Sequence, residues 1–369
     1  LNDDIGLYVN HDAVRDARNV LTQLPLAERA YQRMKLQFIK SHVPSFRLTD
    51  VLGSQSLSQF ERKSGKPLSA GVPGFYTFNG FHSIFQMQIS RTVKNLMEDN
   101  WVYGDNINIH TVDHDLAVKG VRERYYRDYI YEWESLINDI SLKATPSLEL
   151  SLIQSRILSS SERPIESFLK AVQKEVSLTK VSLSQNEKVA AEVATKTADV
   201  ALHNKKNAIG RFMPTENTNL AISLPGKEVE RAFEGIVKIE QQDFELINQS
   251  LVGLREYLAD LSSSGNNQKL AYKSILDGTV TEDVARSLKR TNAILPSPFN
   301  RWLVGLSHES TRLAEKGSQI HLNQIWKSQV VKAYERSIKG RYPFSPAAKR
   351  EVNLKDFKRF FGYGGTLDS

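Results

Sequence analysis

The chain has 369 residues, 40% of them hydrophobic and 25% charged, which is the balance of an ordinary folded protein with enough material for two or three packed domains. It contains no cysteine, which excludes disulfides, thiolate nucleophiles and cysteine metal sites. The formal net charge is +7, but basic residues are mixed with acidic ones along the chain, which favours a solvated basic surface over a nucleic-acid-binding face.

Membrane-spanning and targeting signals are missing from the sequence. No run approaches the roughly 18 consecutive apolar residues that can cross a bilayer. The first residue is Leu1, not Met, and no signal-peptide pattern follows it. We therefore expect a piece of a longer protein or a processed product, with any transmembrane helix outside this sequence.

Helical periodicity dominates the first half of the chain, and proline and glycine mark the breaks between segments. The strongest signal lies over residues 112–143, where large apolar and aromatic side chains recur at three- and four-residue steps on one broad face. Residues 44–78 are rich in glycine and proline, which predicts turns. The helices predicted in this half are 12–23, 25–41, a short one at 54–62, 79–100, 112–143, 147–159 and 164–177.

Polar residues dominate positions 180–225, where we expect a solvated helix over 184–206 and a linker after it. A long helical region should follow from Pro298 to Ile338, with a break near Gly317. Its inward stripe is predicted to comprise Leu322, Trp326, Val330, Ala333, Tyr334 and Ile338. The other helices predicted after the linker are 227–234, 241–261, 266–275, 280–291 and 354–361.

These patterns predict a mainly α fold of elongated multi-helix bundles with no substantial sheet. The composition divides the chain into three parts. We expect an N-terminal helical region at 1–180, a polar helix and linker at 181–225, and a C-terminal helical region at 226–369.

Candidate chemistry is sparse. His110 and His114 could share one helix face, but a zinc site needs further ligands, and Thr111 stands where HExxH enzymes carry glutamate. Asp113 and Asp115 lie at a predicted helix start, where acidic residues more often interact with the helix dipole than form a catalytic pair. No nucleophile elbow or phosphate-binding loop occurs. We therefore predict no catalytic residue, metal site, cofactor or small-molecule substrate.

Three groups of residues, read in chain order, carry a resemblance to a known family. The first comprises Gly65-Lys66-Pro67-Leu68, Gly71-Val72-Pro73-Gly74-Phe75-Tyr76-Thr77 and Gly80-Phe81. The second is Glu98-Asp99-Asn100-Trp101-Val102-Tyr103-Gly104. The third comprises Gly340-Arg341-Tyr342-Pro343-Phe344, Asp356-Phe357, Phe360-Phe361 and Gly364-Gly365. In this order and separation they resemble the signatures of the IcmF-related family, over about residues 12–369.

The resemblance implies a structural scaffold and not an enzyme. Type VI secretion members of this family are inner-membrane proteins that self-associate within a multimeric membrane core complex. Their periplasmic part joins a TssL-like inner-membrane protein to a TssJ-like outer-membrane lipoprotein. The resemblance implies that this chain is the helical periplasmic region, with the lipoprotein contact mostly outside it in a terminal β-rich domain.

The signature residues have the properties of rigid joints. Proline fixes backbone direction, glycine permits close approach or unusual backbone angles, and aromatic side chains bury large areas. We expect structural or interface roles for Pro67, Gly71, Pro73, Gly74, Tyr76, Thr77, Gly80, Phe81, Trp101, Gly104, Arg341, Tyr342, Pro343, Phe344, Asp356, Phe357, Phe360, Phe361, Gly364 and Gly365.

Other interpretations stay open. One is a peptidoglycan-active enzyme of the envelope, which loss of glycan cleavage on changing Glu98 or Asp113 would support. Another is a scaffold of the related type IVB secretion system, which carries similar signatures. A basic nucleic-acid-binding module is the third, and we expect no nucleic acid as a partner because acidic residues interrupt the basic ones.

Overall fold

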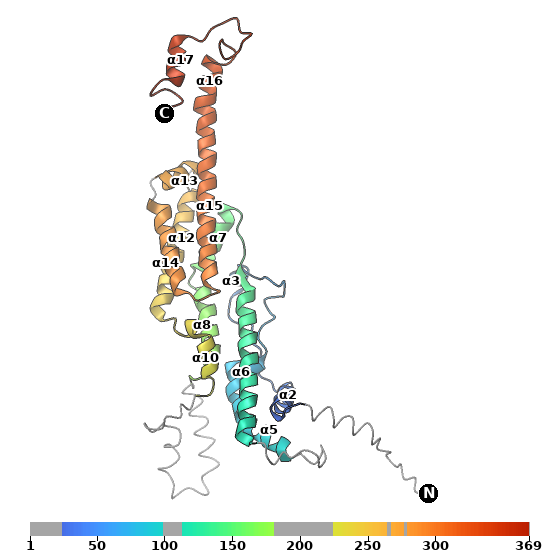
Figure 1. Cartoon of the computed structure of the whole chain (residues 1–369). Coiled ribbons are helices and arrows are strands. Elements are labelled where there is room, and N and C mark those ends of the chain that lie inside the picture. The colour runs from blue at the N-terminus through green and yellow to red at the C-terminus, as the bar shows by residue number, and fades with distance from the viewer. Residues whose placement is uncertain (1–23, 99–112, 181–223, 264–266, 277–278, 369) are drawn as a thin grey trace, which may run out of the picture. The chain divides into compact units, whose positions relative to one another are not determined.

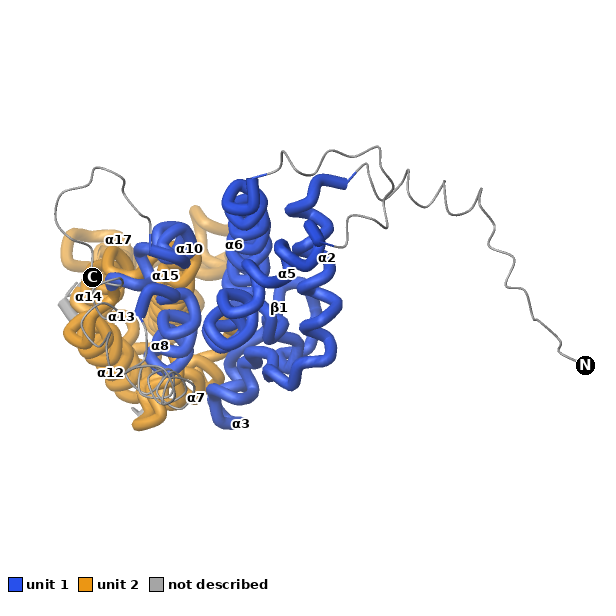
Figure 2. Tube along the Cα trace, turned by 90° about the horizontal axis from the view of Figure 1, so that it is seen from below, with its two compact units in different colours: residues 1–141, 166–238 blue, residues 142–165, 239–369 orange. Residues whose placement is uncertain are grey.

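The structure is a computed structural model that describes residues 24–98, 113–180, 224–263, 267–276 and 279–368. Within these ranges the fold is mainly helical, as predicted, and its one sheet pairs two three-residue strands, β1 (Phe60–Arg62) and β2 (Ile140–Leu142) (Figure 1). The chain forms two compact units, which Figure 2 colours separately. The first comprises Leu1–Ser141 and Glu166–Lys238, and the second comprises Leu142–Ile165 and Ile239–Ser369.

These units divide the chain differently from the boundaries expected near residues 180 and 226. Residues 142–165 belong to the second unit because α7 (Leu148–Leu158) packs against α12 (Gln241–Ser263). Residues 226–238 stay with the first unit because α10 (Lys227–Ala232) packs against α6 (His114–Asp139). The apolar face of a helix packs against another element that can bury it, and that element is often distant in the sequence. The predicted helices 12–23 and 184–206 lie outside the described residues.

Helix α6 forms the core of the first unit. Asp113 caps its start, because the Asp113 carboxylate accepts a hydrogen bond of 2.9 Å from the backbone N–H of Asp115. The structural interpretation of this acidic residue is therefore confirmed. The predicted inward face is also confirmed, since Tyr125, Tyr129 and Trp133 are fully buried. Besides α10, the helices α2 (Leu26–Phe38) and α5 (Gln86–Glu98) pack on α6 within this unit.

Short elements complete the first unit. The predicted helix over 54–62 is only partly correct, because α3 (Ser54–Leu57) ends early and the chain then enters β1. This strand is held at the end of α6, where the Arg62 guanidinium donates to the Asp139 carboxylate and Lys63 N–H donates to Asp139 O at 2.9 Å. The other elements of this unit are η1 (Leu48–Asp50), η2 (Gly74–Tyr76), α4 (Phe78–Gly80), the π-helical η3 (Phe81–Phe85), α8 (Pro164–Val176) and α11 (Glu234–Val237).

The second unit is a helix bundle from which one helix continues. Helix α15 (Asn300–Ile325) packs on α13 (Asn267–Leu276) and α14 (Thr279–Ile294), and α14 packs on α12. Helix α15 passes without interruption into the π-helical η6 (Trp326–Val331) and then into α16 (Lys332–Ser337). Figure 1 shows this rod extending past the bundle to α17 (Leu354–Phe361).

The predicted break near Gly317 is wrong. Gly317 lies inside α15, where a Cβ atom would stand 2.8 Å from the Cβ of Ala271 in α13. The glycine therefore allows two helices to approach closely, and the irregular geometry of the rod lies instead at η6.

The predicted inward stripe of the rod is also wrong over most of its length. Leu322 is 47% exposed and Trp326 is 53% exposed, whereas only Ile338 of the predicted set is buried. Neither η6 nor α16 contains a buried residue. An amphipathic pattern predicts a face that is covered, but here the bundle ends before the pattern does.

Replacing Gly317 by alanine should lower the free energy of unfolding by about 1–3 kcal/mol, because the added methyl group overpacks the contact with Ala271. Urea denaturation followed by circular dichroism measures this. Gly305→Ala in the same helix is the matched control, since a Cβ there meets nothing within 4 Å. The control should stabilise the protein by roughly 0.5–1 kcal/mol through helix propensity. Equal effects of the two substitutions would contradict the packing role.

Candidate functional site

The first signature forms a buried joint, which we call the first joint and define as residues Gly71–Phe81. Its entry is tied to the preceding segment by a pair of hydrogen bonds between Phe46 and Val72, of 2.9 and 3.0 Å. A Cβ on Gly71 would lie 1.7 Å from the carbonyl oxygen of Phe46, so only glycine fits this approach. The two prolines of the signature, Pro67 and Pro73, are exposed.

Two further glycines allow the main chain of the first joint to approach other main chain closely. A Cβ on Gly74 would lie 2.3 Å from Val43 O, and one on Gly80 would lie 2.0 Å from Gly74 O. Thr77 closes the turn, because its hydroxyl donates to Gly74 O at 2.8 Å and accepts from Gly80 N–H at 3.1 Å. The Thr77 side chain thus caps α4.

Aromatic side chains of α6 hold the first joint through its main chain. The Tyr125 hydroxyl donates to Phe75 O at 2.6 Å, and the Trp133 indole N–H donates to Tyr76 O at 2.8 Å. Both interactions are buried. Tyr125 also stacks on Phe85, with ring centroids 3.7 Å apart. These contacts satisfy carbonyl groups that would otherwise be buried without a partner, which fixes the position of the turn on α6.

Glu175 of α8 provides the other main-chain contact of the first joint. Its carboxylate accepts a hydrogen bond of 2.6 Å from the N–H of Phe78, and the neighbouring Tyr129 hydroxyl donates to Glu175 O at 2.7 Å. Burial raises the pKa of Glu175 above the ordinary glutamate value, against the opposing effect of the Phe78 hydrogen bond.

A polar cluster lies where the first joint meets α2. The Tyr31 hydroxyl donates to the Asp128 carboxylate at 2.7 Å and lies 2.8 Å from the Tyr76 hydroxyl. The Lys35 ammonium lies 3.8 Å from the same carboxylate. Burial raises the pKa of both Tyr31 and Tyr76, so these hydroxyls stay protonated and act as donors. The cluster therefore orients α2 on α6, and it offers no tyrosinate base.

The third signature has the opposite environment. Tyr342, Phe344, Leu354, Phe357, Phe361 and Tyr363 are all exposed, and together we call them the tip platform. The rings of Phe344 and Phe361 stack at 5.5 Å with an interplanar angle of 11°, and Phe357 lies 4.9 Å from Phe361. Phe360 alone is buried among these phenylalanines, and it packs near Tyr334 at 6.1 Å.

Main-chain and ion-pair contacts hold the segment that carries the tip platform. Tyr342 N–H donates to Arg350 O at 2.9 Å, and Val352 N–H donates to Tyr342 O at 3.0 Å. The Arg341 guanidinium lies 3.5 Å from the Asp356 carboxylate. Gly364 has a φ of 69°, a region that favours glycine, and the turn continues to Gly365. These contacts therefore hold the backbone of the segment in place, while the aromatic side chains of the tip platform stay exposed.

The candidate chemical residues have ordinary structural environments. Glu98 is exposed and lies 3.8 Å from the Lys94 ammonium. His114 hydrogen-bonds to Asp115 at 3.1 Å, and this contact raises its pKa. The signature residues Trp101 and Gly104 and the predicted histidine partner His110 lie outside the described residues. Within the described ranges, no group of three or more His, Asp or Glu residues is placed to hold a metal ion.

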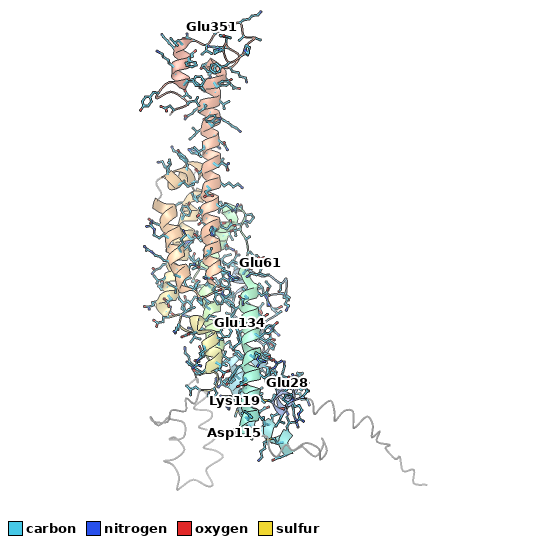
Figure 3. The ribbon with its side chains drawn as sticks, viewed as in Figure 1. Glu28, Glu61, Asp115, Lys119, Glu134 and Glu351 are labelled. Carbon is cyan, nitrogen blue, oxygen red and sulfur yellow. The ribbon has the colours of Figure 1, made fainter. Side chains whose placement is uncertain are left out.

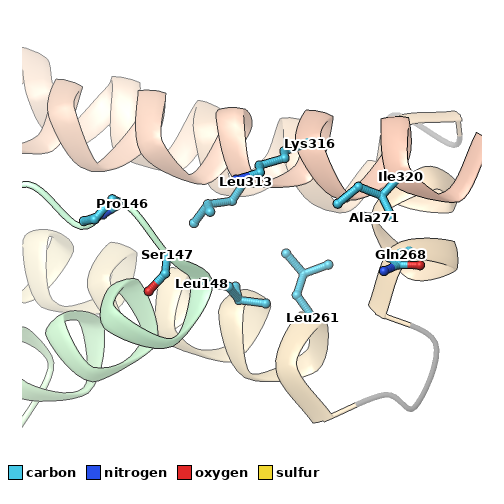
Figure 4. A pocket seen from close by; sticks show the side chains of 10 residues that line it. Pro146, Ser147, Leu148, Leu261, Gln268, Ala271, Leu313, Lys316 and Ile320 are labelled. Carbon is cyan, nitrogen blue, oxygen red and sulfur yellow. The ribbon is translucent and has the colours of Figure 1, made fainter. Parts of the chain in front are cut away.

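A pocket of about 250 Å³ lies in the second unit, between α7, α12, α13 and α15. Figure 4 shows Leu148, Leu261 and Leu313 around it. Its polar side chains are those of Ser147, Gln268 and Lys316, and its ten lining residues include no carboxylate or histidine. This lining is mostly apolar and provides no acid–base pair.

Sequence reasoning missed the donors that hold the first joint and the two π-helical segments η3 and η6 of the described residues. The spacing of Tyr125, Tyr129 and Trp133 predicts that they are buried, but spacing does not reveal that their polar atoms bind main-chain carbonyls. A buried helix face rich in tyrosine and tryptophan is the available signal, because buried hydroxyl and indole groups need partners. The π segments η3 and η6 leave no signal in apolar periodicity that we can identify.

Tyr125→Phe should lower the free energy of unfolding by about 1–3 kcal/mol, because it leaves Phe75 O buried without its donor. Urea denaturation measures the change. Tyr131→Phe is the matched control on the same helix, since Tyr131 is exposed, and it should change stability by less than about 0.5 kcal/mol. Indistinguishable stabilities for the two variants would contradict a role for this hydrogen bond.

Glu175→Gln should remove a pH-dependent loss of stability. A carboxyl group whose pKa is raised by folding makes the folded state less stable as pH rises from the ordinary value of 4.5 through the raised value. The amide does not ionise, and its oxygen can still accept from Phe78 N–H. The variant should match the parent at acidic pH and exceed it at neutral pH, as measured by urea denaturation across pH.

Glu134→Gln serves as the control for this titration, because Glu134 is an exposed residue of α6, labelled in Figure 3. Its stability profile should run parallel to that of the parent. A Glu175→Gln profile that also runs parallel would show that the carboxyl group titrates alike in the folded and unfolded states.

Comparisons with known proteins agree with the signatures. Residues 4–177 match the IcmF-related family model, described as "Intracellular multiplication and human macrophage-killing". The chain is 30% identical over 385 residues to the "Type VI secretion system component TssM1" of Pseudomonas aeruginosa, a similarity that covers 98% of the chain. A solved chain from a "Type VI secretion system membrane core complex" matches 93% of the chain with a TM-score of 0.59 and 14% identity.

The chain covers 33% of the length of the curated relative and 60% of the solved chain. The solved structure shows that the fold is shared. None of the helices in the described ranges combines the length and apolar character that crossing a membrane requires. The signatures, the family model over residues 4–177 and the relative that matches along almost the whole chain lead to one conclusion: the chain belongs to the IcmF-related family.

Proposed function

We propose that this chain is a scaffold segment of a type VI secretion membrane core complex and acts in the periplasm. The observation that carries the proposal is the 30% identity to a type VI secretion component over 98% of the chain. A type IVB scaffold remains the alternative within the family, but the matched relative belongs to a type VI system.

The geometry of the two units supports a mechanical role. The first joint is held by buried main-chain contacts that resist rotation of the turn on α6. In the second unit, the rod from Asn300 to Ser337 extends about 55 Å at 1.5 Å per residue. Rigid turns and long continuous helices suit a protein that keeps distant parts of an assembly at fixed separation.

The partners are proposed from the same relationship. We infer that the chain self-associates and works with a TssL-like inner-membrane protein and a TssJ-like outer-membrane lipoprotein, the latter bound mostly by residues outside this chain. Transmembrane helices that anchor the protein would also lie outside it. Catalysis has no part in this proposal, because Asp113 caps α6 and Glu98 pairs with Lys94, so each of these acids has a structural role.

Sedimentation velocity on the purified chain tests the proposal. The chain should show a concentration-dependent rise in sedimentation coefficient, or should co-sediment with the cognate lipoprotein lacking its lipid. A salt series separates specific assembly from charge-driven aggregation, because exposed charges are screened at high ionic strength. A single 41.8 kDa species at every concentration, with and without the lipoprotein, would contradict an assembly interface in this chain.

A further inference from the structure

A net positive charge lies beside the tip platform. Residues 326–369 contain ten Lys and Arg and four Asp and Glu, a formal net charge of +6. The last segment of the chain therefore combines a net positive charge with exposed aromatic side chains.

Most of the acidic groups in this segment already have partners. Asp356 lies 3.5 Å from Arg341, Glu335 lies 3.0 Å from Lys339, and Asp368 accepts the Gly364 N–H at 2.7 Å. Glu351, labelled in Figure 3, is exposed. No carboxylate within the described residues forms an ion pair with the basic side chains of α17, which are Lys355, Lys358 and Arg359.

Helix α17 places apolar and basic side chains on adjoining faces. Leu354, Phe357 and Phe361 follow helical spacing and share one face, and Leu354 is 67% exposed. The basic residues of α17 occupy the next part of the helix surface, while Asp356 projects from the side opposite the exposed apolar residues. An exposed apolar face beside a continuous basic face is the arrangement of helices that bind at a membrane interface.

Charge decides among the possible occupants of this surface. A second copy of the same segment would bring another +6 against the first, so like charges would oppose self-association through the tip platform. An anionic bilayer attracts clustered Lys and Arg, and its interfacial region accommodates phenylalanine and tyrosine side chains. We propose that the tip platform and the basic face of α17 dock on a membrane surface that contains anionic phospholipid.

This inference does not rest on the scaffold function. If the chain assembles but does not bind vesicles, only the membrane-docking proposal is contradicted. If it binds vesicles but does not assemble, only the proposed scaffold function is contradicted. Interfacial binding has two contributions, the insertion of apolar side chains and the attraction between charges. Each contribution can be tested by its own experiment.

Vesicle co-sedimentation with the whole chain tests the charge contribution. The chain should bind vesicles of two parts phosphatidylcholine to one part phosphatidylglycerol, and should bind pure phosphatidylcholine much more weakly. The triple variant K355Q/K358Q/R359Q should partition roughly 100-fold more weakly, since each cation contributes roughly fivefold near an anionic surface. High salt should weaken the binding of the parent.

A second triple variant, K94Q/K119Q/K238Q, is the matched control. It removes the same charge from three exposed lysines in the first unit, each of which pairs with a glutamate four residues away along its helix. Its vesicle binding should stay within about twofold of the parent. Equal losses from both triple variants would mean that net charge alone drives binding, which overturns the proposal.

Tryptophan quenching tests the apolar contribution. In vesicles with brominated acyl chains, Phe357→Trp should add fluorescence that the bromine quenches, whereas Tyr131→Trp on α6 should add fluorescence that is not quenched. Lack of binding to anionic vesicles, equal binding to neutral ones, or equal quenching of both variants would overturn the proposal. So would tip-dependent binding of an acidic helical peptide without vesicle binding, which would identify an acidic protein partner instead.

Discussion

Three aromatic side chains of α6 donate hydrogen bonds to main-chain carbonyls of segments that are distant in sequence, and the first unit is organised around them. The carbonyls belong to Phe75, Tyr76 and Glu175, so one helix holds both the first joint and α8. Glycine makes this possible, because Gly74 and Gly80 bring main chain to distances that a Cβ would prevent. Close backbone approach and buried donors depend on each other here, since the turn exposes its carbonyls to α6 only in this compact form.

The first and third signatures contain the same residue types but place them in different environments. Prolines, glycines and aromatic residues occur in both, yet Tyr76 and Phe81 are buried whereas Tyr342 and Phe357 are exposed. What differs is the neighbouring structure. In the first unit, side chains of α6 and α2 contact these aromatic residues, whereas α16 covers little of α17 beyond Phe360. A motif of this composition therefore predicts a stiff turn, and the neighbouring helices decide whether the turn faces inward.

Apolar periodicity predicted the positions of most described helices and the inward face of α6, because long helices that pack along their length carry a repeated signal. The same reasoning failed at Leu322 and Trp326, since periodicity does not say where the covering bundle ends. It also misread Gly317, where a residue that breaks isolated helices instead permits contact with Ala271. The division into units depended on contacts between distant segments. The motif did not predict that the aromatic side chains of the third signature are exposed, and only the fold shows it.

The π-helical segment η6 sets the direction in which everything beyond it faces. An α-helix turns by about 100° per residue, and a π turn takes up about one residue more than an α turn. The same residues wound as continuous α-helix would therefore present α17 rotated by about 100° around the axis of the rod, with little change in its distance from the bundle. Six residues, Trp326–Val331, thus determine the direction in which the basic surface of α17 faces around the rod axis, independently of how firmly α15 is packed.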